Sequence, residues 1–179
     1  MAKLLRSNVT VLWAYPEAFA DPANPTAAEL NDQFVYGTNE DAMVFNISCA
    51  ILDDGFTASI TDSETDDSRT ICDIGQVQNP TFTQYEVSFD AFRDQSVTDN
   101  GLFNQFFDLF KGVDRPGWII TRIGKENSAP FLTNGSDDIK QFGLVTDYPN
   151  DLVEDNSMAR FGARFKTTGE IQINYRVEA

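Results

Sequence analysis

Apolar and polar residues alternate along most of this chain, and this period of two is the feature that most constrains its fold. The clearest examples are residues 83–92 (TQYEVSFDAF), 159–165 (ARFGARF) and 170–177 (EIQINYRV). Each stretch places apolar side chains on one face of an extended strand and polar side chains on the other. Strands with a single apolar face belong to antiparallel sheets. The sequence therefore predicts a mainly β fold, an antiparallel β-sandwich or barrel.

The alternation also predicts where two strands begin or end and whether Cys49 is buried. Residues 42–52 (AMVFNISCAIL) are predicted as one strand in which Cys49 shares an apolar face with Ile47. We therefore expect Cys49 to be a reduced thiol in the core, and a disulfide to Cys72 is the alternative. Near the end of the chain, residues 167–169 (TTG) are predicted to break the strand that begins with ARFGARF.

Two stretches depart from the β pattern and predict helices. Phenylalanines recur at helical spacing in residues 101–111, which predicts an amphipathic helix packed on a sheet, with Asp99 or Asn100 as its N-cap. Earlier in the chain, Thr26 is followed three positions later by Glu29. This spacing is that of a capping box and predicts one helical turn.

Length and charge limit the classes of protein to which the chain can belong. With 179 residues, we expect a single domain over residues 1–179. The chain has 13 Lys and Arg against 28 Asp and Glu, a net charge of -15, which argues against tight nucleic-acid binding. No apolar run approaches the roughly 20 residues of a membrane-spanning helix, so we expect no membrane partner.

The chain contains no histidine, which removes Ser-His-Asp and Cys-His catalysis and histidine-based zinc sites. We therefore expect no enzyme and no cofactor. The remaining catalytic alternative is a carboxylate glycosidase, which needs two acids on facing elements. Glu86 and Glu170 lie on the polar faces of predicted strands and are its candidates, although a solvated polar face explains both equally well.

An acidic run occupies residues 61–73 (TDSETDDSRTICD). Its charged residues are Asp62, Glu64, Asp66, Asp67, Arg69 and Asp73. An EF-hand loop that begins at Asp62 would have Asp67 where a glycine makes the sharp turn, and Asp73 where a bidentate Glu is needed. This mismatch argues against a dedicated calcium site. A calcium-dependent β-sandwich adhesin or lectin remains an alternative function.

Basic residues are distributed unevenly. None lies between Arg6 and Arg69, whereas Arg160, Arg164 and Lys166 gather on one face of a predicted strand. The acidic N-terminal half and this basic strand could pair within one subunit or between subunits. Such charge complementarity mainly determines register and the choice of partner.

Residues 20–32 (ADPANPTAAELND) carry the most specific pattern in the chain. Its matching residues are Pro25, Thr26, Glu29, Leu30 and Asn31. This segment resembles the N-terminal region of siphophage major tail proteins, the tail tube subunits, in phages that infect actinobacteria. The order of the remaining elements is also similar: an acidic loop, a single helix in the middle of the chain, and long closing strands.

The resemblance implies a structural virion protein rather than an enzyme. Members of this family fold as a β-sandwich with one flanking α-helix and join into hexameric rings. The rings stack around a tape-measure protein, and tail-completion and terminator proteins are further partners. One sheet of each subunit contributes to a β-barrel that lines the lumen, and an acidic wall lets genomic DNA pass without binding. The expected location is the virion tail, assembled in the host cytoplasm.

The resemblance also suggests a role for the acidic run. We expect residues 61–70 to form a loop between stacked rings, ordered by contacts to a neighbouring subunit. The loop residues in this prediction are Asp62, Glu64, Asp66, Asp67 and Arg69. The possible complementary face on the neighbour consists of Arg160, Arg164 and Lys166.

Overall fold

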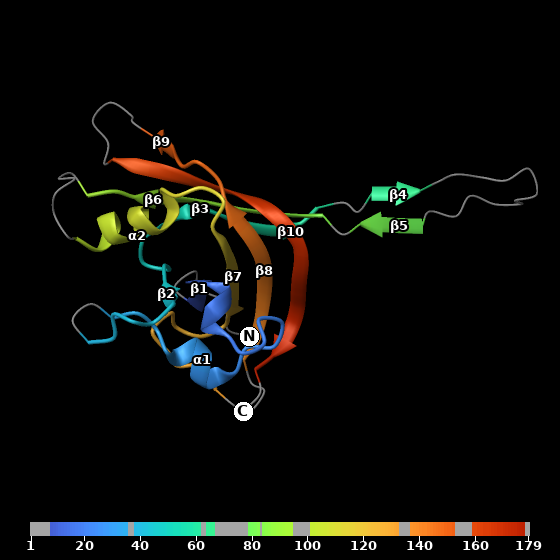
Figure 1. Cartoon of the computed structure of the whole chain (residues 1–179), viewed down its shortest axis with the longest axis horizontal. Coiled ribbons are helices and arrows are strands. Elements are labelled where there is room, and N and C mark those ends of the chain that lie inside the picture. Colours follow the sequence, from blue (N-terminus) through green and yellow to red (C-terminus); the bar gives the residue numbers. More distant parts are fainter. Residues whose placement is uncertain are drawn as a thin grey trace, which may run out of the picture.

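A computed structural model describes residues 8–35, 38–61, 64–66, 79–82, 84–94, 101–132, 137–152 and 159–177 (Figure 1). Its helices are η2 (Pro16–Ala18, a 3-10 turn), α1 (Ala27–Asn31) and α2 (Leu102–Phe110). Its strands are β1 (Val9–Ala14), β2 (Val44–Asn46), β3 (Ile51–Ile60), β4 (Glu64–Asp66), β5 (Asn79–Phe82), β6 (Tyr85–Phe92), β7 (Pro116–Ile123), β8 (Asp138–Thr146), β9 (Asn150–Leu152) and β10 (Arg160–Arg176). The prediction of a mainly β, antiparallel fold with a flanking helix is confirmed.

Most strands belong to one antiparallel sheet with the order β2-β1-β7-β8-β10-β6-β3, and β9 pairs with β10 beside this path. The sheet curls strongly, so that its two ends approach each other around α2 as in a half-barrel (Figure 1). β10 makes this curl possible because its 17 residues serve both halves of the sheet. Its beginning, Arg160–Arg164, pairs with β6, and its remainder pairs with β8.

The predicted break in the C-terminal strand is wrong, because β10 continues through it. The register between β10 and β8 shifts between Thr167 and Ile171, and Gly169 within the shift has a φ of 87°. Glycine accepts this left-handed conformation without the steric cost that other residues meet. The phenol of Tyr85 holds the irregularity in place: it accepts a hydrogen bond from the N–H of Gly169 (3.1 Å) and donates one to the carbonyl of Gly143 (2.6 Å).

Two hydrophobic cores lie on opposite faces of the sheet. The first fills the curl and contains the inward residues of β6 and β10 together with Phe106 and Phe110 of α2. The second lies beneath α1 and contains Leu30, Trp118 and Phe131. Both faces of β1 are therefore buried, and the expectation that each strand has only one apolar face is wrong for this strand.

The capping box at α1 is confirmed. The N–H of Glu29 donates to the hydroxyl of Thr26 (3.4 Å), and the Glu29 carboxylate accepts from the N–H of Thr26 (2.8 Å). The same carboxylate accepts from the N–H of Ala20 (2.8 Å), so it also holds the preceding loop. Burial raises the pKa of Glu29, but these hydrogen bonds outweigh burial and keep the pKa below its ordinary value of 4.5.

The prediction for the N-terminus of α2 is wrong. Its N-cap is Gly101, which has no side chain to accept a hydrogen bond. The carboxylate of Asp94, at the end of the preceding β segment, instead accepts from the N–H of Asn104 (3.1 Å). A distant residue thus satisfies one of the free N–H groups of the first turn. Asp99 and Asn100, the predicted caps, lie outside the described residues.

The single strand predicted over residues 42–52 is also wrong, because a turn at residues 47–50 divides it into β2 and β3. The hydroxyl of Ser48 accepts from the N–H of Val11 (2.8 Å) and donates to the side-chain oxygen of Asn46 (2.7 Å). These bonds replace the regular ladder at the end of β2. They also leave Cys49 exposed and free, not buried as predicted. Cys72, its possible partner, lies outside the described residues.

A buried ion pair fastens the loop after β7. Arg122 and Asp137 are almost fully buried, and their nearest charged atoms lie 4.0 Å apart. The guanidinium of Arg122 donates to the backbone carbonyls of Glu126 (2.8 Å) and Ala129 (2.8 Å). The ammonium of Lys125 lies 2.5 Å from the Asp137 carboxylate. Burial lowers the pKa of Arg122, and the Asp137 carboxylate opposes this shift.

Candidate assembly surfaces

One end of the sheet is an open edge. β3 has ten residues and pairs with β6 on one side, and no described strand pairs with its other side. The opposite end of the sheet is better protected, because β2 has three residues and the N–H of Phe34 donates to the carbonyl of Val44 (2.7 Å). A long strand with unpaired N–H and C=O groups is a template for pairing with another chain. The sheet therefore offers one edge for extension.

The described part of the acidic run, which includes Glu64–Asp66, lies on an extension of the β3–β6 hairpin. The N–H of Thr61 donates to the carbonyl of Gln84 (2.9 Å), and beyond this bond β4 and β5 form a separate two-stranded sheet. Figure 1 shows these two strands standing away from the rest of the fold. Glu64 and Asp66 belong to β4, so this part of the run is a strand and not a loop. The other predicted loop residues, Asp62, Asp67 and Arg69, lie outside the described residues, as does Asp73.

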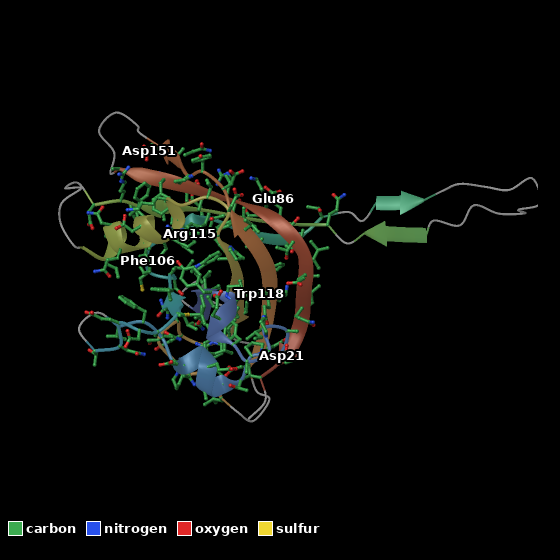
Figure 2. The ribbon with its side chains drawn as sticks, viewed as in Figure 1. Asp21, Glu86, Phe106, Arg115, Trp118 and Asp151 are labelled. Atoms are coloured by element: carbon green, nitrogen blue, oxygen red, sulfur yellow. The ribbon has the colours of Figure 1, made fainter. Side chains whose placement is uncertain are left out.

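The outer face of β3, β6 and β10 is polar. Registered neighbours across it are Thr57, Ser88 and Arg164, one from each strand. Glu86 is exposed on the same face, and Figure 2 shows it on the outside of the sheet, away from α2. Because the inward residues of these strands fill the first core, this outer face is available to water or to another molecule.

The same geometry bears on the glycosidase alternative. Glu86 and Glu170 are both exposed, whereas a glycosidase acid needs an environment that disfavours its charged form. Glu170 lines a hollow of about 520 Å³ together with Trp118 and Asp21, and Glu86 is not part of that lining. The structure does not bring the two carboxylates together around one cleft.

The predicted basic face lies at the start and middle of β10. The Arg164 guanidinium is 3.4 Å from the Asp90 carboxylate, and the Lys166 ammonium is 3.7 Å from that of Asp147. The side chains of Arg164 and Lys166 remain 47% and 59% exposed, so these ion pairs leave much of both cations in contact with solvent. The guanidinium carbon of Arg160 lies 6.0 Å from the ring centre of Phe92. Exposed pairs of this kind contribute little to folding, which leaves the cations available for a partner.

An acidic surface surrounds η2 and α1. Four acidic residues, Glu17, Glu29, Asp32 and Asp41, are among the lining of a hollow of about 240 Å³. Hydrogen bonds from Asn24 and Ala23 lower the pKa of nearby Asp21. Within the described ranges no three acidic or cysteine side chains come close enough together to hold a metal ion. The surface is therefore a distributed negative charge.

A mainly β subunit with an open sheet edge and a projecting hairpin has the features of a self-assembling structural protein. The chain matches the family described as phage tail tube protein over residues 1–179, and it belongs to this family. Membership implies a virion component that assembles with copies of itself into a tube. No curated protein matches the chain significantly. No helix in the described parts combines the length and apolar character needed to cross a membrane.

Sequence reasoning missed two features of these surfaces. The open edge of β3 depends on which strands become neighbours, and alternation within a strand does not specify this. An apolar groove beside α2 is formed by residues distant in the sequence. The one available signal was the excess of apolar residues on the helix, where Leu102 and Leu109 add to the phenylalanines.

Proposed function

We propose that this chain is the major tail tube subunit of a siphophage that infects actinobacteria. In this proposal one domain spans residues 1–179, and the subunits form hexameric rings that stack into the conduit for genomic DNA. The family match over the whole chain carries the proposal. The open edge of β3 supports it, because ring closure would cover an edge that is a liability in a free subunit.

Contacts within a ring are proposed to use complementary charge as well as the sheet edge. The acidic surface around α1, which includes Asp32 and Asp41, would face basic side chains of the next subunit. No Lys or Arg lies between Arg6 and Arg69, so the acidic surface carries few charges that could neutralise it internally. Attraction between exposed charges weakens as salt screens them. Ring assembly should therefore slow at high ionic strength.

Stacking between rings is proposed to use the β4–β5 extension and the acidic run that it carries. Little in residues 61–70 can offset the entropy of ordering, since five of the ten residues are charged. Contacts to Arg160, Arg164 and Lys166 of a subunit in the next ring would compensate. The tape-measure and terminator proteins would bind the finished tube, in the virion tail, after assembly in the host cytoplasm. The net charge of -15 would keep transiting DNA from adhering to the wall.

Electron microscopy of concentrated purified protein tests the main proposal. Tubes with six-fold rings are expected, and tails of the source phage that lacked this chain would exclude the proposal. Calcium provides a second measurement: a calcium-dependent rise in melting temperature would favour the adhesin alternative, whereas the tube subunit should show none.

Proline substitutions test the role of the β3 edge. Successive N–H groups of an antiparallel strand point to opposite sides. Of Thr57→Pro and Ala58→Pro, one removes an outward N–H and the other breaks the ladder to β6. The variant that keeps the higher melting temperature identifies the outward position, and it should remain monomeric. Normal tubes from that variant would exclude edge pairing.

Trypsin tests the stacking role of the acidic run. Arg69 is the only Lys or Arg between Arg6 and Arg93. Brief digestion of free subunits should cut after Arg69 and give one pair of fragments, while assembled tubes should resist. Equal cleavage in tubes would remove the proposed role in stacking. Equal resistance in the free subunit would mean that the run is already ordered, and a bound ion would become the leading explanation.

A further inference from the structure

α2 carries more apolar surface than the fold uses. One face of the helix, which includes Phe107 and Phe110, packs against phenylalanine rings of β10. A second stripe at positions i, i+4 and i+7 faces a groove of about 470 Å³. The groove is lined by Leu102, Phe106 and Leu109 of this stripe and, from the opposite side, by Phe34, Val35 and Phe45. Figure 2 marks Phe106 on the side of α2 that faces β2.

The groove leaves apolar side chains in contact with water. Val35 on one wall is 52% exposed and Leu102 on the other is 51% exposed. Single exposed apolar residues are common on protein surfaces, but a concave, contiguous set marks a docking surface. Because the chain belongs to a family whose members assemble into a tube, a second copy of the chain is the occupant that the observations favour.

A second copy presents one side chain of suitable chemistry. Tyr148 is 71% exposed, the highest value among the exposed large apolar residues in the described ranges, and it is the only aromatic among them. It lies in the short connection between β8 and β9. Exposed tyrosines are frequent anchors of interfaces because they bury a large ring at a low cost in conformational entropy.

Hydrogen bonds hold the backbone of the connection that carries Tyr148. The N–H of Asp147 donates to the carbonyl of Arg164 (3.1 Å), and the N–H of Tyr148 donates to the Asp147 carboxylate (2.9 Å). Just before it, the hydroxyl of Thr146 donates to the carbonyl of Gly112 (2.7 Å). Pro149 follows, which fixes the backbone on the other side. An anchor that is held in place before binding loses little freedom when it binds.

We propose that Tyr148 of one subunit inserts its ring into the apolar groove beside α2 of a neighbouring subunit. The phenylalanine and leucine walls would cover the ring, and the Asp108 carboxylate at the rim would accept the phenol hydrogen. This carboxylate is 62% exposed and binds Lys111 through one oxygen, which leaves the other available. Because the anchor and the groove lie on different parts of the surface, the contact can repeat head to tail and propagate around a ring. The inference rests on the proposed tube function.

Assembly measurements provide the first test. Tyr148→Ala should raise the concentration at which tubes form by about 10-fold or more, as loss of an interface anchor does. Tyr148→Phe keeps the ring and should assemble nearly as well as the wild type. The matched control is Ile173→Ala, which truncates another exposed apolar residue (41% exposed) away from both surfaces. All variants should melt at the wild-type temperature as monomers.

Photo-cross-linking provides the second test. A p-benzoylphenylalanine at position 148 retains an aromatic anchor and reacts with its neighbours on illumination. In assembled tubes it should cross-link to the tryptic peptides 94–111 or 7–69, which contain the two walls of the groove. Cross-links only to peptides other than these two, or unchanged assembly of Tyr148→Ala, would overturn the inference while leaving the tube function intact. Wild-type protein that forms no tubes at any concentration would instead contradict the proposed function, and this inference with it.

Discussion

Phe110 should be the most important residue of α2 for stability. It is 2% exposed, and its ring meets those of Trp13 (5.2 Å between centroids), Phe89 (5.1 Å) and Phe165 (5.8 Å). Truncation of a fully buried phenylalanine costs about 3–5 kcal/mol, because transfer free energy is lost and a cavity remains. Three aromatic partners place Phe110→Ala towards the upper end of this range.

Alanine substitutions at two other residues of α2 should destabilise the fold less than Phe110→Ala does. Phe107 is half-buried, with its ring 5.1 Å from that of Phe161, so Phe107→Ala should cost roughly half as much as Phe110→Ala. Leu102 is 51% exposed, and Leu102→Ala should change the free energy of unfolding by less than about 1 kcal/mol. The expected order of destabilisation is therefore Phe110, then Phe107, then Leu102.

Urea denaturation of dilute monomer, followed by circular dichroism, measures these differences. In a thermal melt of the same variants, a loss of about 4 kcal/mol would lower the melting temperature of a chain of this size by about 8–16 °C. Equal effects of Phe110→Ala and Leu102→Ala would show that α2 does not pack on the sheet as described. An unchanged midpoint for both variants would show that the helix contributes nothing to the first core.

The remaining predictions concern the ion pair, the capping box and the cysteine. Asp137→Ala leaves the guanidinium of Arg122 buried without its carboxylate, so it should lower the free energy of unfolding measured in urea by about 3–5 kcal/mol. A loss as small as that from breaking an exposed ion pair would contradict the burial of this pair. Thr26→Ala should cost about 1 kcal/mol through loss of the α1 cap, measured in the same way. The pKa of Glu29 is lowered on folding, so its contribution is present above pH 4.5 and is lost as the pH falls through the folded-state pKa. The destabilisation caused by Glu29→Gln should therefore shrink in acid, and a constant difference across pH would refute this. Cys49, being exposed, should react with a maleimide in the folded protein as fast as in urea.

Local patterns in the sequence were sufficient for features that depend on neighbours along the chain. The alternation in residues 83–92 predicts the inward residues of β6, and Tyr85, Val87 and Phe89 are buried as expected. The capping box at Thr26 was predictable because its partners are three residues apart. The position of α2 was predictable because its phenylalanines repeat at helical spacing.

Features that depend on distant partners were not predictable in the same way. Cys49 is exposed because Ser48 bonds to Val11, which lies 37 residues away in the sequence. Leu12 is buried because Leu30 of α1 and Phe131, from the segment after β7, cover the second face of β1. The groove beside α2 combines residues near position 35 with residues after 101. A single sequence contains no direct record of such contacts. The inter-subunit roles of the acidic run and the basic strand stay predictions.

The position of β10 in the sheet has a consequence for synthesis on the ribosome. β10 follows the other described strands in the sequence, yet it lies between β8 and β6 in the middle of the sheet. The two halves of the curled sheet cannot join until this segment leaves the exit tunnel, because each pairs with a different part of it. Native pairing between distant segments also forms slowly. A nascent subunit therefore cannot present a finished β3–β6–β10 surface to completed neighbours before β10 has been synthesised.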